Sequence, residues 1–351
     1  MAMELTDNLN IEQFKPLTTP EKLKADFPET EAAAHLVAES RRQVERILRR
    51  NDKRRMIIVG PCSLHDEEAT LDYARRLFKV QKSYSGQVLI LMRAYFEKPR
   101  TTLGWKGILY DPHLDGSYDL DFGIRTSRKL LCEIAEIGMP CATEFLDPIV
   151  PQYLADLISW AAIGARTAES QIHRQMASGL SMPIGFKNAT DGNIAVAMDA
   201  IKAASNPHSF LGINRKGQVI VAETRGNKYG HLVMRGGTNR PNYSSEFVAF
   251  AEVLLSKANL SNGMVVDCSH ANSAKNHKRQ GRALLDIADQ IQLGNTSIAG
   301  VMIESFIKEG KQNIGAAGGL KYGISLTDGC IGWDETEELI GRLAEAVKAS
   351  G

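Results

Sequence analysis

The chain lacks any uninterrupted apolar stretch close to the roughly 20 residues that a membrane-spanning helix needs. Its first residues do not show the basic and then apolar pattern of a secretory signal peptide. Cysteine is scarce, and the five cysteines are odd in number and widely separated, which argues against a disulfide framework. We therefore expect a cytoplasmic protein that has no membrane partner.

Net charge is also nearly absent, because 42 Lys and Arg residues offset 41 Asp and Glu residues and leave +1. A general positive field that would attract nucleic acid is missing, so we expect no nucleic-acid partner. Any affinity for anions must come from local groups of cations. The hydrophobic share of 43% is typical of a globular protein with a large core.

Eight short apolar segments alternate with amphipathic helical patterns and are typical of buried strands. They lie at residues 56–60, 88–92, 141–143, 161–165, 182–186, 231–234, 264–266 and 297–303. Eight βα units favour the α/β class and a (β/α)8 TIM barrel, because right-handed crossovers leave few other arrangements. An open doubly wound sheet is the alternative. It would need a glycine-rich nucleotide turn near its start, and residues 60–63 do not form one.

A barrel of this type takes about 250 residues, which leaves roughly a hundred over. One surplus lies at residues 1–50, with helices expected from Pro20 and over residues 31–49. We interpret it as a regulatory or oligomerisation extension that precedes a catalytic barrel at residues 51–351. The other surplus is an inserted β-hairpin at about 209–230, which we expect to turn at residues 215–217.

An ionisable or metal-binding residue follows each of the eight predicted strands. In chain order these residues are Cys62, Arg93, Glu144, Arg166, Lys187, Arg235, His270 and Glu304. Taken singly, such residues have ordinary explanations, as a buried thiol, a helix cap or a surface ion pair. A barrel brings all eight positions to one face, where active sites form, so the set together predicts a functional site.

Some of these positions, with one nearby polar loop at residues 326–330, offer sulfur, nitrogen and carboxylate ligands. The candidate ligands are Cys62, His270, Glu304 and Asp328. This combination suits one divalent ion of borderline softness, such as Mn, Fe, Co or Zn, and is too soft for a dedicated magnesium site.

Six cations form a second group, which includes three in the aromatic-rich loop after residues 88–92. They are Arg93, Lys98, Arg100, Arg166, Lys187 and Arg235. A solvated surface loop is the simpler interpretation of residues 93–107, but surface loops rarely carry so many aromatic side chains. Six cations suffice for two phosphates and a carboxylate. A Lewis acid beside them suggests a carbonyl that is polarised while a phosphorylated partner attacks it.

Seven short motifs follow one another along the chain. They are GPCS at 60–63, FEKPRTT at 96–102, GWKG at 104–107, GART at 164–167, GFKN at 185–188, MRGG at 234–237 and DCSHAN at 267–272. Together they resemble the 3-deoxy-D-arabino-heptulosonate-7-phosphate (DAHP) synthases of the microbial class with amino-acid feedback control. The resemblance runs from the N-terminal extension to the last helix. One departure is Ala168, where relatives carry a second threonine, and we expect binding by Arg166 to survive it.

The resemblance implies condensation of phosphoenolpyruvate with erythrose 4-phosphate, the first step of the shikimate pathway. It also implies a (β/α)8 barrel, one divalent metal ion and a homotetramer built as a dimer of dimers. The implied metal ligands are Cys62, His270, Glu304 and Asp328. The implied phosphoenolpyruvate site consists of Arg93, Arg166, Lys187 and Arg235, with Lys98 and Glu144 nearby.

The phosphate of erythrose 4-phosphate is implied to bind Arg100 and Thr101. Lys98 would lie between the two substrates, and we predict that it delivers the proton to the new hydroxyl group. With Cys62 and His270 it makes up the predicted catalytic set.

Regulated members of the family bind an aromatic amino acid away from the active site. The residues that match this site are Pro151, Gln152, Leu180, Ser181 and Phe210, with Asp7 and Asn8 expected from a neighbouring subunit. An apolar wall with a few polar groups suits an aromatic ring. Asn8 and residues 212–214 favour tyrosine as the inhibitor over phenylalanine or tryptophan.

Three other functions stay open at this point. An octulosonate-phosphate synthase would use arabinose 5-phosphate, but that class carries a different motif at the position of residues 98–102. A metal-dependent aldolase that does not use phosphoenolpyruvate has no need of so many cations. A catalytically inactive sugar-phosphate sensor would not need the complete set of metal ligands.

Overall fold

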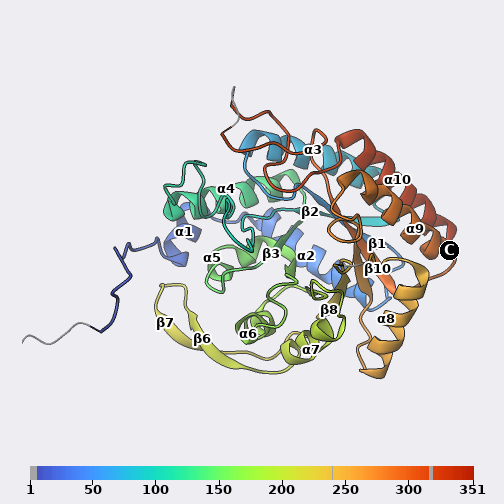
Figure 1. Ribbon diagram of the computed structural model, residues 1–351, viewed down its shortest axis with the longest axis horizontal. Helices are drawn as coiled ribbons and strands as arrows, with labels where there is room; N and C mark the ends of the chain where they lie inside the picture. The colour runs from blue at the N-terminus through green and yellow to red at the C-terminus, as the bar shows by residue number, and fades with distance from the viewer. Residues whose placement is uncertain (1–5, 239, 316–318) are drawn as a thin grey trace, which may run out of the picture.

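The computed structural model describes residues 6–238, 240–315 and 319–351. Eight parallel strands close into a barrel in the spatial order β1-β10-β9-β8-β5-β4-β3-β2 (Figure 1). Their bounds are β1 Arg55–Gly60, β2 Val88–Arg93, β3 Cys141–Glu144, β4 Ile158–Ile163, β5 Ile184–Lys187, β8 His231–Met234, β9 Met264–Asp267 and β10 Ile298–Glu304. The (β/α)8 barrel predicted from the sequence is confirmed, and the open sheet is excluded.

Helices surround the barrel. They are α1 Pro20–Asp26, α2 Glu31–Leu48, α3 Glu67–Tyr84, α4 Leu120–Ile137, α5 Pro151–Leu154, α6 Gln171–Gly179, α7 Ala195–Ala204, α8 Ser245–Lys257, α9 Gln280–Gln292 and α10 Trp333–Ala349. Local signals set their ends. The Asp119 carboxylate accepts a hydrogen bond from the backbone of Phe122 at the start of α4, and Gly138 ends the helix in the left-handed conformation with φ of 95°.

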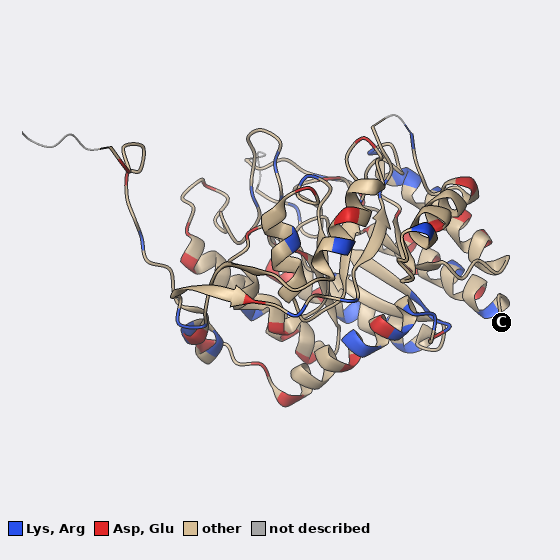
Figure 2. Cartoon of the chain, turned by 90° about the horizontal axis from the view of Figure 1, so that it is seen from below, with Lys and Arg blue, Asp and Glu red and all other residues tan. Residues whose placement is uncertain are grey.

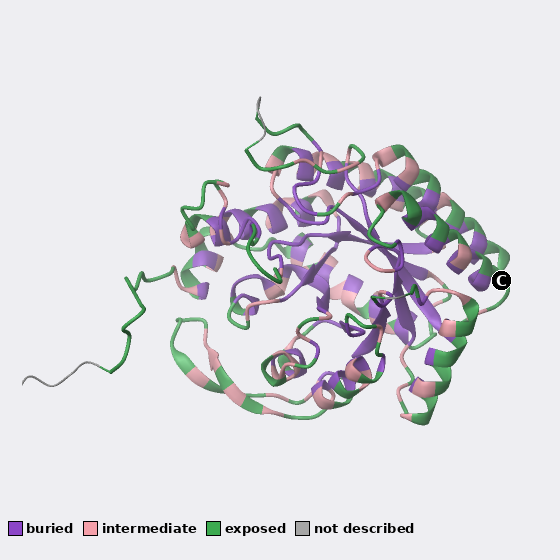
Figure 3. Cartoon of the chain, in the orientation of Figure 1, coloured by how far each residue is buried: buried purple, intermediate pink, exposed green. Residues whose placement is uncertain are grey.

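The strands are buried on both faces, as their continuous apolar runs predict. Alternate residues such as Met56 and Ile58 fill the barrel interior, while Ile57 and Val59 pack against the helices. Figure 3 shows this buried centre inside helices that are exposed on their outer sides. Trp160 occupies much of the interior. A Cβ atom on Gly185 would lie 2.4 Å from the Trp160 ring, so glycine is required there.

The fourth strand departs furthest from its predicted bounds. It lies at Ile158–Ile163 instead of 161–165, directly after α5 and a 3-10 turn over Ala155–Leu157. Arg41 of α2 explains the earlier start, because its guanidinium donates to the carbonyl oxygens of Ala155 and Ile158. The polar Ser159 is thereby buried, with its hydroxyl 2.6 Å from that of Ser40.

Part of the N-terminal extension packs under the barrel. Val44, Ile47 and Leu48 of α2 belong to the same buried cluster as the inward-facing strand residues. Residues 6–17 instead run away from the body of the protein as an exposed arm (Figure 1). The helical part of the extension therefore contributes to the core, whereas the arm does not.

The predicted hairpin is present as β6, Ser209–Ile213, paired antiparallel with β7, Val219–Glu223. The Asn214 side chain shapes its turn by accepting hydrogen bonds from the backbone of Lys216 and Gln218, and Gly217 adopts a φ of 75°. In the part of the chain that the structure describes, none of the helices has the length and apolar character needed to cross a membrane.

A buried histidine in the barrel predicts a pH dependence of stability. Trp160 Nε1 donates to His231 Nε2 at 3.0 Å, so Nδ1 carries the proton and lies 2.9 Å from the Tyr229 carbonyl oxygen. Burial lowers the pKa of His231 to about 4. His231 therefore becomes protonated near pH 6.5 in the unfolded chain but only near pH 4 in the folded protein. The free energy of unfolding consequently falls as the pH drops from 6.5 through 4.

We expect His231→Gln to remove part of this acid sensitivity, because each unit of pKa difference corresponds to about 1.4 kcal/mol. The measurement is the difference between the thermal midpoints at pH 7 and pH 5. His35→Gln is the control, since His35 is exposed on α2. Equal differences in wild type and His231→Gln would contradict the assignment.

Candidate active site at the C-terminal ends of the strands

A cavity of about 300 Å³ opens at the C-terminal ends of the barrel strands. Most of the sequence-predicted site residues line it, namely Arg93, Lys98, Arg100, Thr101, Glu144, Arg166, Lys187, Arg235, His270, Glu304 and Asp328. Cys62 is fully buried beside the cavity. Figure 2 shows both signs of charge spread over the whole chain, so the concentration of cations in this cavity is a local feature.

Two buried ion pairs join strand ends across the barrel. Arg93 Nη2 lies 3.1 Å from Glu304 Oε1, and Lys187 Nζ lies 2.8 Å from Glu144 Oε2. Burial would lower the pKa of Lys187, but the Glu144 carboxylate outweighs it and holds that pKa above its ordinary value. Lys187 therefore keeps its charge, and each pair offsets the cost of removing its members from water.

Three other guanidinium groups in the cavity have no such partner. Among the described residues, Arg100, Arg166 and Arg235 form no ion pair with a carboxylate. Arg235 is held through its backbone N–H, which donates to Asn188 Oδ1 at 2.8 Å. Ala168 is fully buried and its N–H donates to the Gly164 carbonyl oxygen, which holds the turn that carries Arg166. These guanidinium groups are available to an anionic ligand.

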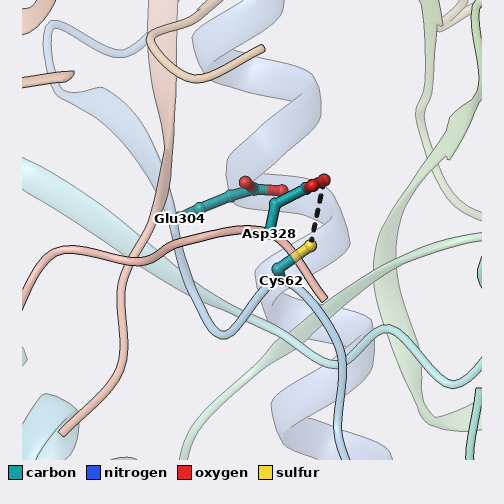
Figure 4. Close-up of side chains that lie close together, drawn as sticks. All are labelled: Cys62, Glu304 and Asp328. Carbon is teal, nitrogen blue, oxygen red and sulfur yellow. Dashed lines mark hydrogen bonds between the residues drawn. The ribbon is translucent and has the colours of Figure 1, made fainter. Parts of the chain in front are cut away.

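One sulfur atom and two carboxylates lie close together at the cavity, on Cys62, Glu304 and Asp328 (Figure 4). Ligand atoms of Cys62, Glu304 and Asp328 all lie within 4.8 Å of one another. Strand pairing explains this closeness, because Gly60 at the end of β1 is in register with Glu304 of β10, and Cys62 follows in the loop. The Lys98 ammonium group lies 3.1 Å from the Cys62 sulfur.

This group of ligands fits a divalent cation of borderline softness. Burial, together with the nearby Glu304 charge, raises the pKa of Cys62 to about 11. A thiolate here would therefore need a cation beside it, and two carboxylates complete a set of sulfur and oxygen ligands. The residues predicted from the sequence to hold a metal ion are suited to that task.

His270 is the predicted metal ligand that lies outside this close group. It lines the same cavity, with Nδ1 2.9 Å from Asp267 Oδ2 and 2.7 Å from the Ser269 hydroxyl oxygen. The ring therefore has its second nitrogen free to face a ligand. Its membership in the metal site stays a prediction.

Sequence reasoning missed two residues of the site. Asp267 is fully buried and, besides its contact with His270, lies 4.0 Å from Lys187 Nζ. Tyr95 is also buried, with the Arg93 guanidinium 3.9 Å from the centre of its ring. Asp267 stands at the end of β9, so the rule of strand ends could have found it. Tyr95 lies in the aromatic-rich loop at residues 93–107, but nothing in the sequence singled it out from the other aromatic residues there.

The predicted allosteric residues lie partly together. Pro151, Gln152, Leu180 and Ser181 line a second cavity of about 400 Å³, away from the strand ends. Phe210 is on β6 and does not belong to that lining, while Asp7 and Asn8 are exposed on the N-terminal arm. Charged groups of Arg41, Asp156 and Arg215 complete the wall.

Comparison with known proteins decides the family. A model of the DAHP synthetase I family matches residues 27–340. The chain belongs to this family. Phospho-2-dehydro-3-deoxyheptonate aldolases of Escherichia coli strain K12 are similar to it over nearly their whole length. The Trp-sensitive protein is 50% identical over 345 residues, which cover 98% of this chain and 99% of that relative.

Relatives that are named for sensitivity to other amino acids match this DAHP synthetase I family member about equally well. The Phe-sensitive protein of the same strain is 50% identical over 343 residues, or 98% of each chain. The Tyr-sensitive protein is 49% identical over 341 residues, or 97% of this chain and 96% of that one. The solved structure of a phospho-2-dehydro-3-deoxyheptonate aldolase from Francisella tularensis SCHU S4 has a TM-score of 0.96 at 47% identity, and the match covers 97% of this chain and 100% of that chain.

We expect Cys62→Ser to lower the affinity for Co²⁺ by at least roughly 10-fold, because a hydroxyl group is a poor substitute for a thiolate ligand. The measurement is a calorimetric titration of metal-free protein with Co²⁺, and the sulfur-to-cobalt absorption band should be present in the wild type and absent in Cys62→Ser. Cys132→Ser is the matched control, since Cys132 is a half-buried thiol on α4 outside the cluster. If Cys62→Ser binds Co²⁺ with unchanged affinity, Cys62 is not a metal ligand.

Proposed function

We propose that the protein is a DAHP synthase that condenses phosphoenolpyruvate with D-erythrose 4-phosphate and water to give DAHP and phosphate. The observation that carries this proposal is the cavity in which three unpaired guanidinium groups, two buried ion pairs and a sulfur and carboxylate cluster meet. A phosphorylated acid and an aldehyde phosphate need such a combination. The names of the relatives point to the same reaction.

In this proposal the phosphoenolpyruvate site uses the unpaired Arg166 and Arg235 for its phosphate. Arg93 and Lys187, which their carboxylate partners hold in place, provide positive charge for the carboxylate of this substrate. Arg100 and Thr101, in the loop after β2, bind the phosphate of erythrose 4-phosphate. Binding both substrates in one cavity brings the reacting carbons together, which lowers the entropic cost of the reaction.

The metal ligands in this proposal are Cys62, His270, Glu304 and Asp328, with Mn, Fe, Co or Zn as the ion. A bound divalent ion supplies Lewis-acid polarisation of the aldehyde oxygen. Carbon 3 of phosphoenolpyruvate forms the new bond to the aldehyde carbon, and water adds at carbon 2. Cleavage of the bond between carbon 2 and the phosphate oxygen then releases phosphate and leaves the ketone.

Lys98 is the proposed proton donor to the new hydroxyl group. Its ammonium group lies 3.1 Å from both the Cys62 sulfur and the Cys62 carbonyl oxygen, beside the candidate metal ligands. Burial opposes its charge, but the nearby Cys62 and Glu304 side chains outweigh this effect and raise the pKa of Lys98. The amine is therefore protonated at neutral pH, as a general acid must be.

Exposed apolar side chains support the proposal that the protein is a tetramer. The exposed apolar side chains include Leu9, Ile11 and Phe14 on the arm and Leu211 and Val219 on the hairpin. Such side chains gain from being covered by a second copy of the chain. A neighbouring arm would then bring Asp7 and Asn8 to the second cavity.

The test of the function is an assay of phosphate release that requires both substrates and is abolished by a chelator. In that assay Lys98→Ala should lower kcat by roughly 100-fold or more if the amine donates the proton. Loss of a purely binding role would raise KM instead.

Lys202→Ala is the control for this prediction, because Lys202 lies exposed on α7. Wild-type kcat in Lys98→Ala at saturating substrates would reject the catalytic role. Turnover of arabinose 5-phosphate in preference to erythrose 4-phosphate would reject the proposed substrate, and activity without phosphoenolpyruvate would favour a simple aldolase.

We further propose that an aromatic amino acid inhibits the enzyme from the second cavity, with tyrosine as the first candidate. Relatives sensitive to tryptophan, phenylalanine and tyrosine are 49% to 50% identical to this chain, so overall identity does not favour one of them. Inhibition from this distance requires a free-energy difference between two states that the N-terminal arm helps to set.

Deletion of residues 1–15, or Ser181→Phe, is expected to remove inhibition and to leave catalysis largely intact. The measurement is the activity against increasing tyrosine, phenylalanine or tryptophan. Ser261→Phe serves as the control, because Ser261 is an exposed serine in the loop after α8. A deletion variant that keeps the wild-type inhibition curve would show that the arm has no regulatory part.

A further inference from the structure

A second layer of hydrogen-bonded side chains lies behind the cavity and connects three consecutive loops. We call Glu97, Tyr110, Asp147 and His173 the loop lock. None of these four is among the described residues that line the cavity. Each of the loops that they connect carries a proposed substrate-binding residue. These residues are Lys98 after β2, Glu144 at the end of β3 and Arg166 after β4.

Glu97 connects the first loop to the second. Its side chain is 2% exposed, and its carboxylate accepts hydrogen bonds from the backbone N–H groups of Leu146 at 3.3 Å and Asp147 at 3.0 Å. Its chain neighbour Lys98 reaches in the cavity toward Cys62. The contact therefore fixes the backbone beside Lys98 against the backbone just after Glu144.

His173 connects the second loop to the third. Its Nε2 lies 2.7 Å from the Leu146 carbonyl oxygen, and its Nδ1 lies 2.9 Å from the Ser170 hydroxyl oxygen. Because a carbonyl oxygen can only accept, Nε2 carries the proton and Nδ1 accepts from Ser170. The peptide of Leu146 is thus held at its N–H by Glu97 and at its carbonyl by His173.

Tyr110 closes the loop lock on its outer side. Its hydroxyl oxygen lies 3.3 Å from Glu97 Oε1 and 3.3 Å from Asp147 Oδ2. Among the described residues Glu97 has no cation as a partner, so a buried carboxyl group is kept here at a cost that an apolar side chain would avoid. Packing alone does not explain this choice of residue.

We propose that Glu97 and His173 are positioning residues that set the spacing of Lys98, Glu144 and Arg166. This inference rests on the proposed function of the cavity. Substrate binding by groups on three separate loops requires that the loops keep their distances. A displacement of about 1 Å can cost roughly 100-fold in rate even when the residue concerned does not touch the substrate.

The test uses His173→Phe and Glu97→Gln in the full-length protein loaded with metal. His173→Phe fills the same space without a donor for the Leu146 carbonyl. Glu97→Gln places an amide group where two N–H donors converge. Both should lower kcat/KM for phosphoenolpyruvate by roughly 10- to 100-fold and weaken the binding of inorganic phosphate, measured by calorimetry. His173→Gln, which restores a donor, should recover part of the loss.

His208→Phe is the matched control. His208 Nε2 lies 2.8 Å from the Ala203 carbonyl oxygen, the same kind of contact, but near the hairpin and away from the cavity. If the loop lock were merely structural, the control and His173→Phe would lower the thermal midpoint alike and leave kcat/KM unchanged. That result overturns the proposal, as does an equal loss of kcat/KM in both variants.

The proposed function and the loop lock fail in different ways. If the wild-type protein does not turn over the two substrates, the proposed function is wrong. The affinity of the variants for inorganic phosphate then tests whether the loop lock positions the cavity residues. Weaker phosphate binding in His173→Phe or Glu97→Gln than in His208→Phe supports it. If one variant does not fold, the other gives the answer.

Discussion

Burial of charge at the converging strand ends is the constraint on which the rest of this structure depends. Closure of eight parallel strands brings their last residues to one face. Here those residues include Arg93, Glu144, Lys187 and Glu304, each less than a tenth exposed. Removing one partner of such a pair costs about 3–5 kcal/mol, so each cation requires its carboxylate. The barrel can hold a charged site only because these charges are paired.

The division between paired and unpaired cations organises the site. Arg93 and Lys187 each form an ion pair with a carboxylate of the protein, which holds them in place. Among the described residues, Arg166 and Arg235 have no such pair and are open to an anionic ligand. The opposite end of the barrel contributes to stability, because Val44, Ile47 and Leu48 of α2 cover it with apolar side chains. Stability and ligand binding are therefore assigned to opposite ends of one barrel.

Most of the fold could be predicted from the sequence because its signals are local. Apolar runs indicated the strands, and a stop signal such as Gly138, which ends α4 in the left-handed conformation, lies next to the helix that it ends. The fourth strand was misplaced because its start depends on Arg41, which is distant in the sequence. The types of residue in the site were also predictable, since each follows directly after an apolar run.

Contacts between distant segments could not be predicted in this way. Arg93 and Glu304 are 211 positions apart, and nothing near either residue shows that they pair. The sequence by itself determined the barrel and the chemistry at the strand ends, because both depend on short patterns. Only the tertiary structure decided which charges are paired, that Asp267 faces His270 and that Glu97 ties two loops together. Those facts depend on distances that barrel closure sets.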